Sequence, residues 1–567
     1  MPTTHSPGRP HEEAPPPAPS GRARAGGIAR ALAGHLLRHP FFAPLAEALR
    51  GRRWPAALPG TLDDIAAYHR RRPQDGGATS VSDRVWQDLD MDAVFARVDR
   101  CASAVGQQVL YDLLRSPLSD PERIAERAAL AQRLAEEPAL RAQIERAVSG
   151  LRQRSAYRLP HLLFDELPRR PRLYLAFPAL TVLAAAATAG LLLDPDALFA
   201  VLAIVLLNVS IQAYYRPGVQ HLVAPLASLR ALLSAARRLA ALDDPLLRPR
   251  AEALRVRCSR LRWIDRLVRH LSRETHGNEL IEMAASYLNL VFLLDVNAFV
   301  FSIELIRAHR EDLRAVFEAA GLLDAMCSVA RLRQDLPHWC APEAAPARKE
   351  IVAEGIYHPL LKDPVANDLR IQGRALLITG SNMAGKTTYL RAVGLCALLA
   401  GTIATCPARR WRAPPLRIAS LIARTDDLLG GRSYFLVEAE LVRELLALAE
   451  TDVQHLFIID EIFRGTNTRE RLAAAKAVLE HLNRGAHVCL VSTHDLELLE
   501  LLGPGWEFWH FRETVEDGAV RFDYRIRPGV SSAPNALRLL GVSGYPPGVI
   551  AEALRTYAAL GGAPPAG

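Results

Sequence analysis

ALLITGSNMAGKTTYL, residues 375–390, is the stretch that decides the fold of the C-terminal part of this chain. Its first five residues are apolar or β-branched and predict a buried strand, and the apolar residues through position 399 predict a helix. Between them lies G-x-x-x-x-G-K-T, in the order of strand, loop and helix that this motif requires. The stretch therefore predicts a P-loop within an α/β domain.

The residue types in this loop suit a nucleoside triphosphate. Gly380 and Gly385 let the backbone approach phosphate closely, and the helix N-terminus supplies oriented N–H donors. Lys386 would reach the β and γ phosphates, and the Thr387 hydroxyl would bind Mg²⁺. Lysine is rare here, with four among 69 basic residues, so its use at this position is informative. The residues expected to bind ATP are Gly380, Ser381, Asn382, Met383, Ala384, Gly385, Lys386, Thr387 and Thr388.

Two further predicted strands deliver polar residues at their C-terminal ends. Residues 456–459 are apolar and lead into Asp460 and Glu461, and residues 488–493 lead into His494. Ligands of open α/β sheets bind at this edge of the strands. We expect Asp460 to hold Mg²⁺, Glu461 to orient or deprotonate the attacking water, and His494 to contact the γ-phosphate. The predicted catalytic residues are Lys386, Glu461 and His494.

The chain before position 346 is predicted to be mainly helical. Residues 1–26 are rich in Pro, Gly, Ala and Arg and predict a disordered tail. A helical period over 28–49 and a Pro/Gly/Arg-rich linker over 51–77 follow, and the arginines of that linker are expected to be a solvated face. Helical spacing resumes at position 89, with Asp120 predicted to cap a helix that starts at Pro121.

Two long apolar runs interrupt the helical part. Residues 173–193 and 197–213 carry no charge and are separated only by Asp194-Pro195-Asp196. About 20 apolar residues cross a bilayer and about 17 can suffice, so a transmembrane hairpin is favoured over a buried helical hairpin. Arginines flank the outer ends and the turn is acidic, which predicts a cell-membrane protein with both termini and the ATPase domain in the cytoplasm. Residues 284–306 are also apolar, but their polar residues favour a core helix over a third span.

Composition adds weaker constraints. The net charge of +8 favours a polyanionic partner, either nucleic acid or an anionic membrane surface. The seven cysteines are scattered without a C-x-x-C pair, which argues against a disulfide framework or a zinc site and for a reducing compartment.

Taken together, these motifs resemble the MutS family of ABC-type ATPases. The resemblance rests on His358-Pro359-Leu360, Asn367-Asp368, the P-loop, GRSYFLVE at 431–438, Asp460-Glu461 and Ser492-Thr493-His494, in the family's order. It covers about residues 89–160 and 270–556. Residues 1–88 are too few for the family's mismatch-recognition and connector domains, and the apolar hairpin lies where typical members carry a lever and DNA clamp.

The resemblance adds roles that spacing alone does not give. From the residues, Ser433 is a helix N-cap; the resemblance implies that it contacts the γ-phosphate held by a second subunit of a homodimer. Asn382 would assist the phosphates within one chain. ATP and Mg²⁺ would be the cofactors, and double-stranded DNA and the membrane would be partners in a process related to mismatch repair.

The sequence thus predicts an ABC-type α/β P-loop ATPase domain after a mainly helical core domain, with a two-helix transmembrane hairpin. The alternatives are an ATP-dependent membrane scaffold or sensor that does not bind mismatched DNA, and the ATPase subunit of an ABC transporter, which GRS at 431–433 disfavours. The predicted domains are a tail (1–26), a helix and linker (27–88), two parts of a helical core (89–168 and 217–345), the hairpin (169–216) and the ATPase domain (346–567).

Overall fold

A computed structural model describes residues 60–73, 80–167, 174–271, 288, 291–422, 434–463, 466–516, 519–530 and 545–559. All of them belong to one compact unit, Leu58–Gly567. The predicted tail and the helix predicted over 28–49 lie outside the described residues.

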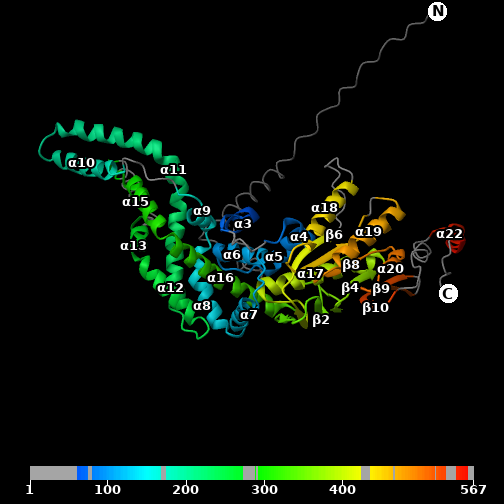
Figure 1. Cartoon of the computed structure of the whole chain (residues 1–567). Helices are drawn as coiled ribbons and strands as arrows, with labels where there is room; N and C mark the ends of the chain where they lie inside the picture. The colour runs from blue at the N-terminus through cyan, green and yellow to red at the C-terminus, as the bar shows by residue number, and fades with distance from the viewer. Residues whose placement is uncertain are drawn as a thin grey trace, which may run out of the picture. The chain divides into compact units, whose positions relative to one another are not determined.

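The N-terminal part of this unit is helical, as the sequence predicts (Figure 1). Asp120 caps α7 by accepting a hydrogen bond from the Glu122 N–H, and Pro121 occupies the first turn, as expected. The helices are α3 (Leu62–Arg71), α4 (Asp83–Asp88), α5 (Met91–Val98), α6 (Ala104–Arg115), α7 (Pro121–Glu136), α8 (Pro138–Val148), α9 (Leu159–Phe164), α10 (Ala176–Gly190), α11 (Ala197–Ala240), α12 (Arg248–Arg260), α13 (Arg262–Leu271), α15 (Leu294–Ala308) and α16 (Arg310–Asp335).

The prediction of a linker over 51–77 is wrong for residues 60–73, the part of it that the structure describes, because these residues contain helix α3. Thr61 and Asp64 form a reciprocal capping box at the start of this helix, which satisfies two backbone N–H groups. Tyr68 is buried, and His69 and Arg72 each lie 2.7 Å from a carboxylate oxygen of Asp112 on α6. His69 and Arg72 are therefore packed against the helical core, whereas Arg70 is exposed and pairs with Asp63.

The two sequence segments predicted to form the helical core pack on each other through α6 and α16. The contact is close because glycine lies at the crossing: a Cβ on Gly321 would fall 2.3 Å from Val109 Cγ2. Asp324 on α16 is fully buried and accepts hydrogen bonds from the Ser103 hydroxyl (2.6 Å) and the Ser103 N–H (2.9 Å). Side chains distant in sequence thus close one continuous core.

The two apolar runs form the antiparallel helices α10 and α11, which contact each other (Figure 1). Two details differ from the sequence prediction. Helix α10 has 15 residues, roughly 22 Å, and among the described residues one helical window, Ala197–Tyr214, is long and apolar enough to cross a membrane. Helix α11 continues for 44 residues, so the domain boundary predicted at 216 falls inside an unbroken helix.

The C-terminal part is an α/β domain. In its described residues the larger sheet has the order β10-β9-β4-β8-β7-β6, in which only β10 is antiparallel to its neighbour, and a smaller sheet has the order β1-β5-β2-β3. The strands are β1 (Glu343–Ala344), β2 (Glu350–Ile356), β3 (Asn367–Gln372), β4 (Ala375–Thr379), β5 (Arg410–Ala413), β6 (Arg417–Ile422), β7 (His455–Asp460), β8 (Val488–Ser492), β9 (Trp506–Glu516) and β10 (Ala519–Pro528).

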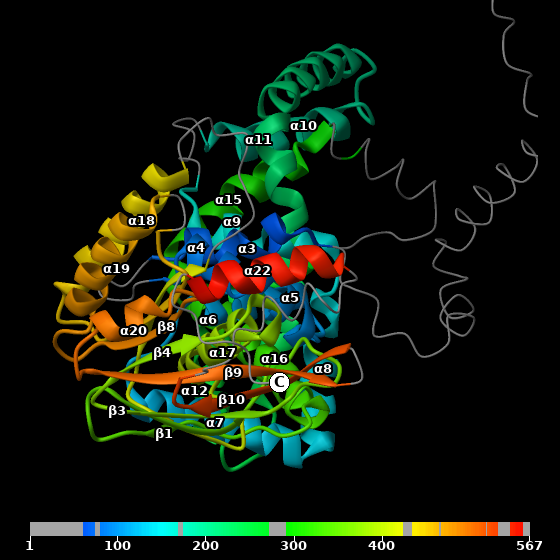
Figure 2. The same cartoon turned by 90° about the vertical axis from the view of Figure 1, so that its right-hand side faces the viewer.

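Helices cover both faces of the larger sheet because alternate strand residues point to opposite sides. Leu376 and Ile378 pack toward α17 (Lys386–Ile403) and the helical core, whereas Leu377 packs toward the opposite layer. That layer consists of α18 (Tyr434–Ala449), α19 (Thr468–Leu482) and α20 (Glu497–Leu501), which lie together on one side in Figure 2. A further helix, α22 (Pro547–Ala559), follows. The α/β class predicted from the sequence is confirmed.

Candidate functional site

The order of the strands brings the predicted site residues to one edge of the sheet. β8 lies between β4 and β7, so the P-loop, His494 and the Asp460-Glu461 pair leave three adjacent parallel strands. Backbone hydrogen bonds tie these exits together, from the Thr493 N–H to the Ile378 carbonyl and from the Glu461 N–H to the Ser492 carbonyl, both at 3.0 Å.

Lys386 is fully buried at the first position of α17. Its ammonium donates a hydrogen bond to the Gly380 carbonyl and lies 3.8 Å from Glu461 Oε1. Gly380 has a φ of 133°, and a Cβ there would lie 2.9 Å from the Phe511 carbonyl oxygen, so this position needs glycine. The loop therefore wraps around the lysine as a phosphate-binding loop does.

The oxygen atoms needed for a magnesium site lie together. The Thr387 hydroxyl donates to Asp460 Oδ2 at 2.6 Å, and the Ser492 hydroxyl donates to Asp460 Oδ1. Asp460 is buried at the end of β7. A hydroxyl and a carboxylate are hard ligands, and one or two of them with water and phosphate oxygens form the usual magnesium environment, so Thr387 and Asp460 fit this ion.

Glu461 and His494 form a second pair at the same edge. Glu461 is buried with a φ of 59°, and its Oε2 lies 3.2 Å from His494 Nδ1. The hydrogen bond that the Glu461 carboxylate accepts from His494 raises the pKa of His494, and burial of the ring partly opposes this shift. The His494 side chain is 53% exposed, whereas Lys386 and Glu461 are buried. A base, an ammonium and an imidazole thus converge from three strands, which is the arrangement that phosphoryl transfer requires.

Of the other residues predicted to bind ATP, the structure describes some side chains and leaves others undescribed. The Ser381 hydroxyl donates to Glu513 Oε2 at 2.7 Å, Ala384 is buried and Met383 is exposed. Ser433 and the side chain of Asn382 lie outside the described residues. α18 spans Tyr434–Ala449, so a helix begins directly after Ser433 and ends where the sequence predicts.

A cavity of about 400 Å³ beside the P-loop was missed by the sequence analysis. Asn367 anchors its far wall, because its side chain accepts from the Ile526 N–H and donates to the Tyr524 carbonyl, both at 2.9 Å. Burial lowers the pKa of His358 in this wall to about 4, so its ring is neutral. Aromatic and apolar side chains with a few polar groups, which include Lys362 and Asp363 here, suit a nucleobase. The cavity lining includes Tyr357, His358, Val365, Met383, Gly385, Thr388, Tyr389, Phe511 and Tyr524.

Sequence signals for this cavity were partial. His358 and Asn367 entered the sequence analysis only as part of the family resemblance, and nothing in the sequence indicated that Tyr524 on β10 would face the P-loop. That placement depends on the antiparallel pairing of β9 with β10 and on the hydrogen bonds of Asn367.

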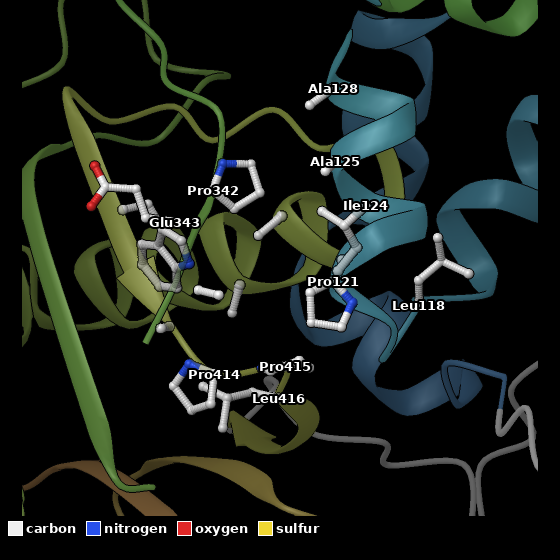
Figure 3. Close-up of a pocket in the computed structure, with 16 residues that line it drawn as sticks. Leu118, Pro121, Ile124, Ala125, Ala128, Pro342, Glu343, Pro414, Pro415 and Leu416 are labelled. Carbon is white, nitrogen blue, oxygen red and sulfur yellow. The ribbon is translucent and has the colours of Figure 1, made fainter. Parts of the chain in front are cut away.

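A second cavity, of about 280 Å³, lies between the helical part and the small sheet. Figure 3 shows Leu118, Pro121 and Ile124 on one side and Pro342, Pro414 and Leu416 on the other. Glu343 is the charged residue of this lining. Apolar walls with one carboxylate do not suit a triphosphate, so this cavity is not the nucleotide site.

The geometry described above defines a P-loop nucleotide hydrolase. Comparison with known proteins specifies the class further: residues 376–561 match the family described as MutS domain V. Among curated proteins, the DNA mismatch repair protein MutS of Natronomonas pharaonis is 31% identical over 265 residues, covering 44% of this chain and 30% of the relative. That of Rhodopseudomonas palustris is 32% identical over 286 residues (47% and 31%), and that of Thermus aquaticus is 36% identical over 200 residues (35% and 24%).

The chain therefore carries a MutS-type domain V, with partial homology to DNA mismatch repair MutS proteins. Domain V is an ABC-type P-loop ATPase, so the chain is an ATP hydrolase that uses ATP and Mg²⁺. The chain spans at most about a third of the length of these curated relatives.

Proposed function

We propose that this chain is a membrane-anchored MutS-type ATPase in which ATP binding and hydrolysis drive closure and reopening of a homodimer. The observation that carries the membrane part is the exposure of α10 and α11. In the window Ala197–Tyr214 the mean hydropathy is 2.1, yet only 11% of it is buried. Soluble monomers rarely expose so large an apolar patch to water, so a lipid bilayer is the partner that fits.

The ends of the hairpin support membrane insertion and indicate its orientation. Exposed Leu192 and Leu193 extend the apolar surface beyond the end of α10, which lengthens a helix that is otherwise short for a span. Tyr214 is exposed at the other end, where tyrosine is favoured at a membrane interface. The turn carries Asp194 and Asp196, whereas arginines flank the outer ends of the hairpin in the sequence. We place the turn outside the cell and both termini in the cytoplasm.

The hydrolytic step follows from the contacts at the sheet edge. Lys386 and the N–H groups of α17 bind the β and γ phosphates, and Mg²⁺ held by Thr387 and Asp460 would neutralise charge on the phosphate oxygens. Water attacks the γ-phosphorus, Glu461 accepts its proton, and the bond to ADP breaks with its electrons on the departing oxygen. His494, which lies 3.2 Å from Glu461, would contact the γ-phosphate through a ring N–H.

Dimer closure rests on the resemblance together with one structural observation. The His494 side chain is half exposed at an otherwise buried site, which leaves the γ-phosphate side open to a second subunit. Ser433 of that subunit, which directly precedes α18 in the sequence, would close it. Mixing a Lys386→Ala chain with a Ser433→Ala chain should restore one composite site per heterodimer and exceed either parent in activity. No gain on mixing, together with a specific activity independent of protein concentration, would exclude the shared site.

DNA binding is the second part of the proposal, and relatives named for DNA mismatch repair support it. The hairpin itself is a poor DNA contact, because residues 173–215 contain no Lys or Arg to neutralise phosphates. The arginines of α12 and α13 are the better candidates. The alternative is a membrane scaffold or sensor that does not bind mismatched DNA. Affinity for duplex DNA that falls steeply with salt supports DNA binding, whereas affinity below detection at low salt supports the scaffold.

Membrane anchoring is tested by fractionation. The full chain should stay with membranes after alkaline carbonate washing, and deletion of residues 174–214 should release an active ATPase. As a second variant, Leu206→Arg should weaken retention because it places a charge on an exposed apolar face. Leu246→Arg is the matched control, since Leu246 is also exposed but lies between α11 and α12. Recovery of the intact chain in the soluble fraction without detergent would refute the anchor.

A further inference from the structure

Helix α15 (Leu294–Ala308) has apolar side chains on two faces. Val296, Val300 and Ile303 are buried in a cluster with Phe177 of α10. Leu294 and Phe301, which are seven residues apart and so share a face, are 47% and 43% exposed. One face thus packs on the base of the hairpin while the other presents large apolar groups outward.

The chain breaks its helical conformation immediately before α15. Leu293 is buried with a φ of 50°, a left-handed conformation that side chains rarely adopt, and residues 291–292 before it are helical. Such a break frees backbone carbonyls, and here side chains of other helices satisfy two in succession. Asn208 Nδ2 donates to the Val291 carbonyl (2.6 Å) and Thr181 Oγ1 donates to the Phe292 carbonyl (2.7 Å), whereas the Leu293 carbonyl accepts the first helical bond of α15 from the Asn297 N–H (3.0 Å).

Both donors belong to the apolar hairpin, on different helices. Asn208 is buried and lies six residues before Tyr214, the end of the apolar window of α11, which is roughly 9 Å along the helix. Thr181 lies five residues after Ala176, the start of α10, which is roughly 8 Å. Both helices therefore place the break at a similar depth, well inside the base of the hairpin.

We infer that α15 is a third membrane-contacting helix, which enters the cytoplasmic leaflet beside α10 and α11 and presents Leu294 to lipid acyl chains and Phe301, roughly 10 Å further along the helix, to lipid at the membrane interface. This inference rests on the membrane anchor proposed above. A depth of roughly 8 Å is less than half of a hydrocarbon core about 30 Å thick, so α15 reaches into one leaflet without crossing. A break in the helix is tolerated at that depth only where protein groups satisfy its carbonyls, which is what Asn208 and Thr181 do.

The charged residues of α15 fit this placement with one cost. Glu304 and Arg307 pair at 2.6 Å near the C-terminal end, where the chain returns to α16. Asp295 is the ionisable residue of the sequence between positions 291 and 303, and an ionisable residue in a membrane-contacting segment is costly. The cost of Asp295 makes a direct measurement of lipid contact the decisive test.

The test is photo-crosslinking of the full chain in phosphatidylcholine–phosphatidylglycerol vesicles. Benzoylphenylalanine replaces Phe301, or Leu202 on the hairpin as positive control, or exposed Leu361 of the ATPase domain as negative control. We expect lipid adducts by mass spectrometry at positions 301 and 202 and none at 361. Adducts at 202 without adducts at 301, or a crosslink from 301 to a second protein chain, would overturn the inference while leaving the anchor intact. The absence of adducts at both positions would overturn the anchor and the inference together.

A substitution pair tests the role of the break. Asn208→Leu removes the donor to the Val291 carbonyl and should lower the adduct yield at position 301 by several fold relative to position 202. Ser210→Ala is the matched control, because the Ser210 hydroxyl bonds to the Leu206 carbonyl of its own helix. Equal yields in the two variants would show that Asn208 does not hold α15 in the leaflet.

Discussion

Replacing Glu461 by Gln tests the hydrolytic site most directly. Glu461 is buried at the end of β7, with Oε2 at 3.2 Å from His494 Nδ1 and Oε1 at 3.8 Å from Lys386 Nζ. Glutamine has nearly the same shape and keeps one carbonyl oxygen, but it cannot accept the proton of the attacking water. We therefore expect a folded protein that binds ATP and hydrolyses it slowly.

The expected loss in kcat follows from the missing general base, and the expected change in Kd follows from the contact between Glu461 and Lys386. Loss of a positioned general base lowers a rate by about 10²–10⁴, which corresponds to about 3–5 kcal/mol in the barrier. Binding should not weaken, because the carboxylate competes with phosphate for the Lys386 ammonium. A pair at this separation is attracted by about 4 kcal/mol at an effective dielectric constant of about 20, before desolvation offsets it. The Kd for ATP should accordingly stay the same or fall.

Steady-state phosphate release measures kcat, and titration with a fluorescent ATP analogue measures Kd. Glu450→Gln is the matched control, because Glu450 is 71% exposed and pairs with His481 on the surface. A kcat close to that of the wild type would remove Glu461 from the catalytic role. A large rise in Kd together with lost turnover would point to a collapsed site and would equally contradict the reasoning.

Three further predictions concern buried positions. Lys386→Arg should lower kcat/KM at least about tenfold, because a guanidinium does not fit where the buried ammonium bonds the Gly380 carbonyl; wild-type kinetics would contradict the P-loop assignment. Gly321→Ala should lower the free energy of unfolding by about 1–3 kcal/mol, because the new Cβ would lie 2.3 Å from Val109 Cγ2. A lower urea midpoint would show this loss. An unchanged midpoint would mean that α6 and α16 can move apart without loss of stability, which contradicts the close packing described here. Burial raises the pKa of Asp324 from 3.8 to about 7, so the stability it contributes is complete below pH 3.8 and lost as pH rises to about 7. Asp324→Asn should flatten the dependence of unfolding free energy on pH in this window, and an unchanged slope would contradict the assignment.

The sequence predicted those parts of the protein whose chemistry is local. The P-loop at 380–387 and the acidic pair Asp460-Glu461 were identified because phosphate binding and metal binding require fixed residue types at fixed spacing next to a strand. The α/β class followed from the same strands. Asp120 was identified as a helix cap for a similar reason, since a cap depends on its own next few residues.

The sequence prediction failed where packing overrides composition. The arginine-rich segment of α3 was predicted to be a solvated linker, but a buried Tyr68 and the contacts to Asp112 place it against α6. The boundary at 216 was placed where hydropathy changes, whereas the backbone of α11 continues through it. Hydropathy reports the surroundings of a helix, and it does not report where the helix ends.

By itself, the sequence contains a P-loop motif and two long apolar runs and predicts a magnesium carboxylate and a general base, because each of these is read from consecutive residues. Only the tertiary structure decided that β8 lies between β4 and β7, which brings Lys386, Glu461 and His494 together. It also decided that Tyr524 lines the cavity beside the loop and that Asn208 and Thr181 bond the chain before α15. These contacts join residues about 30 to 160 positions apart. No local pattern encodes them, because they depend on strand order and on the burial of whole helix faces.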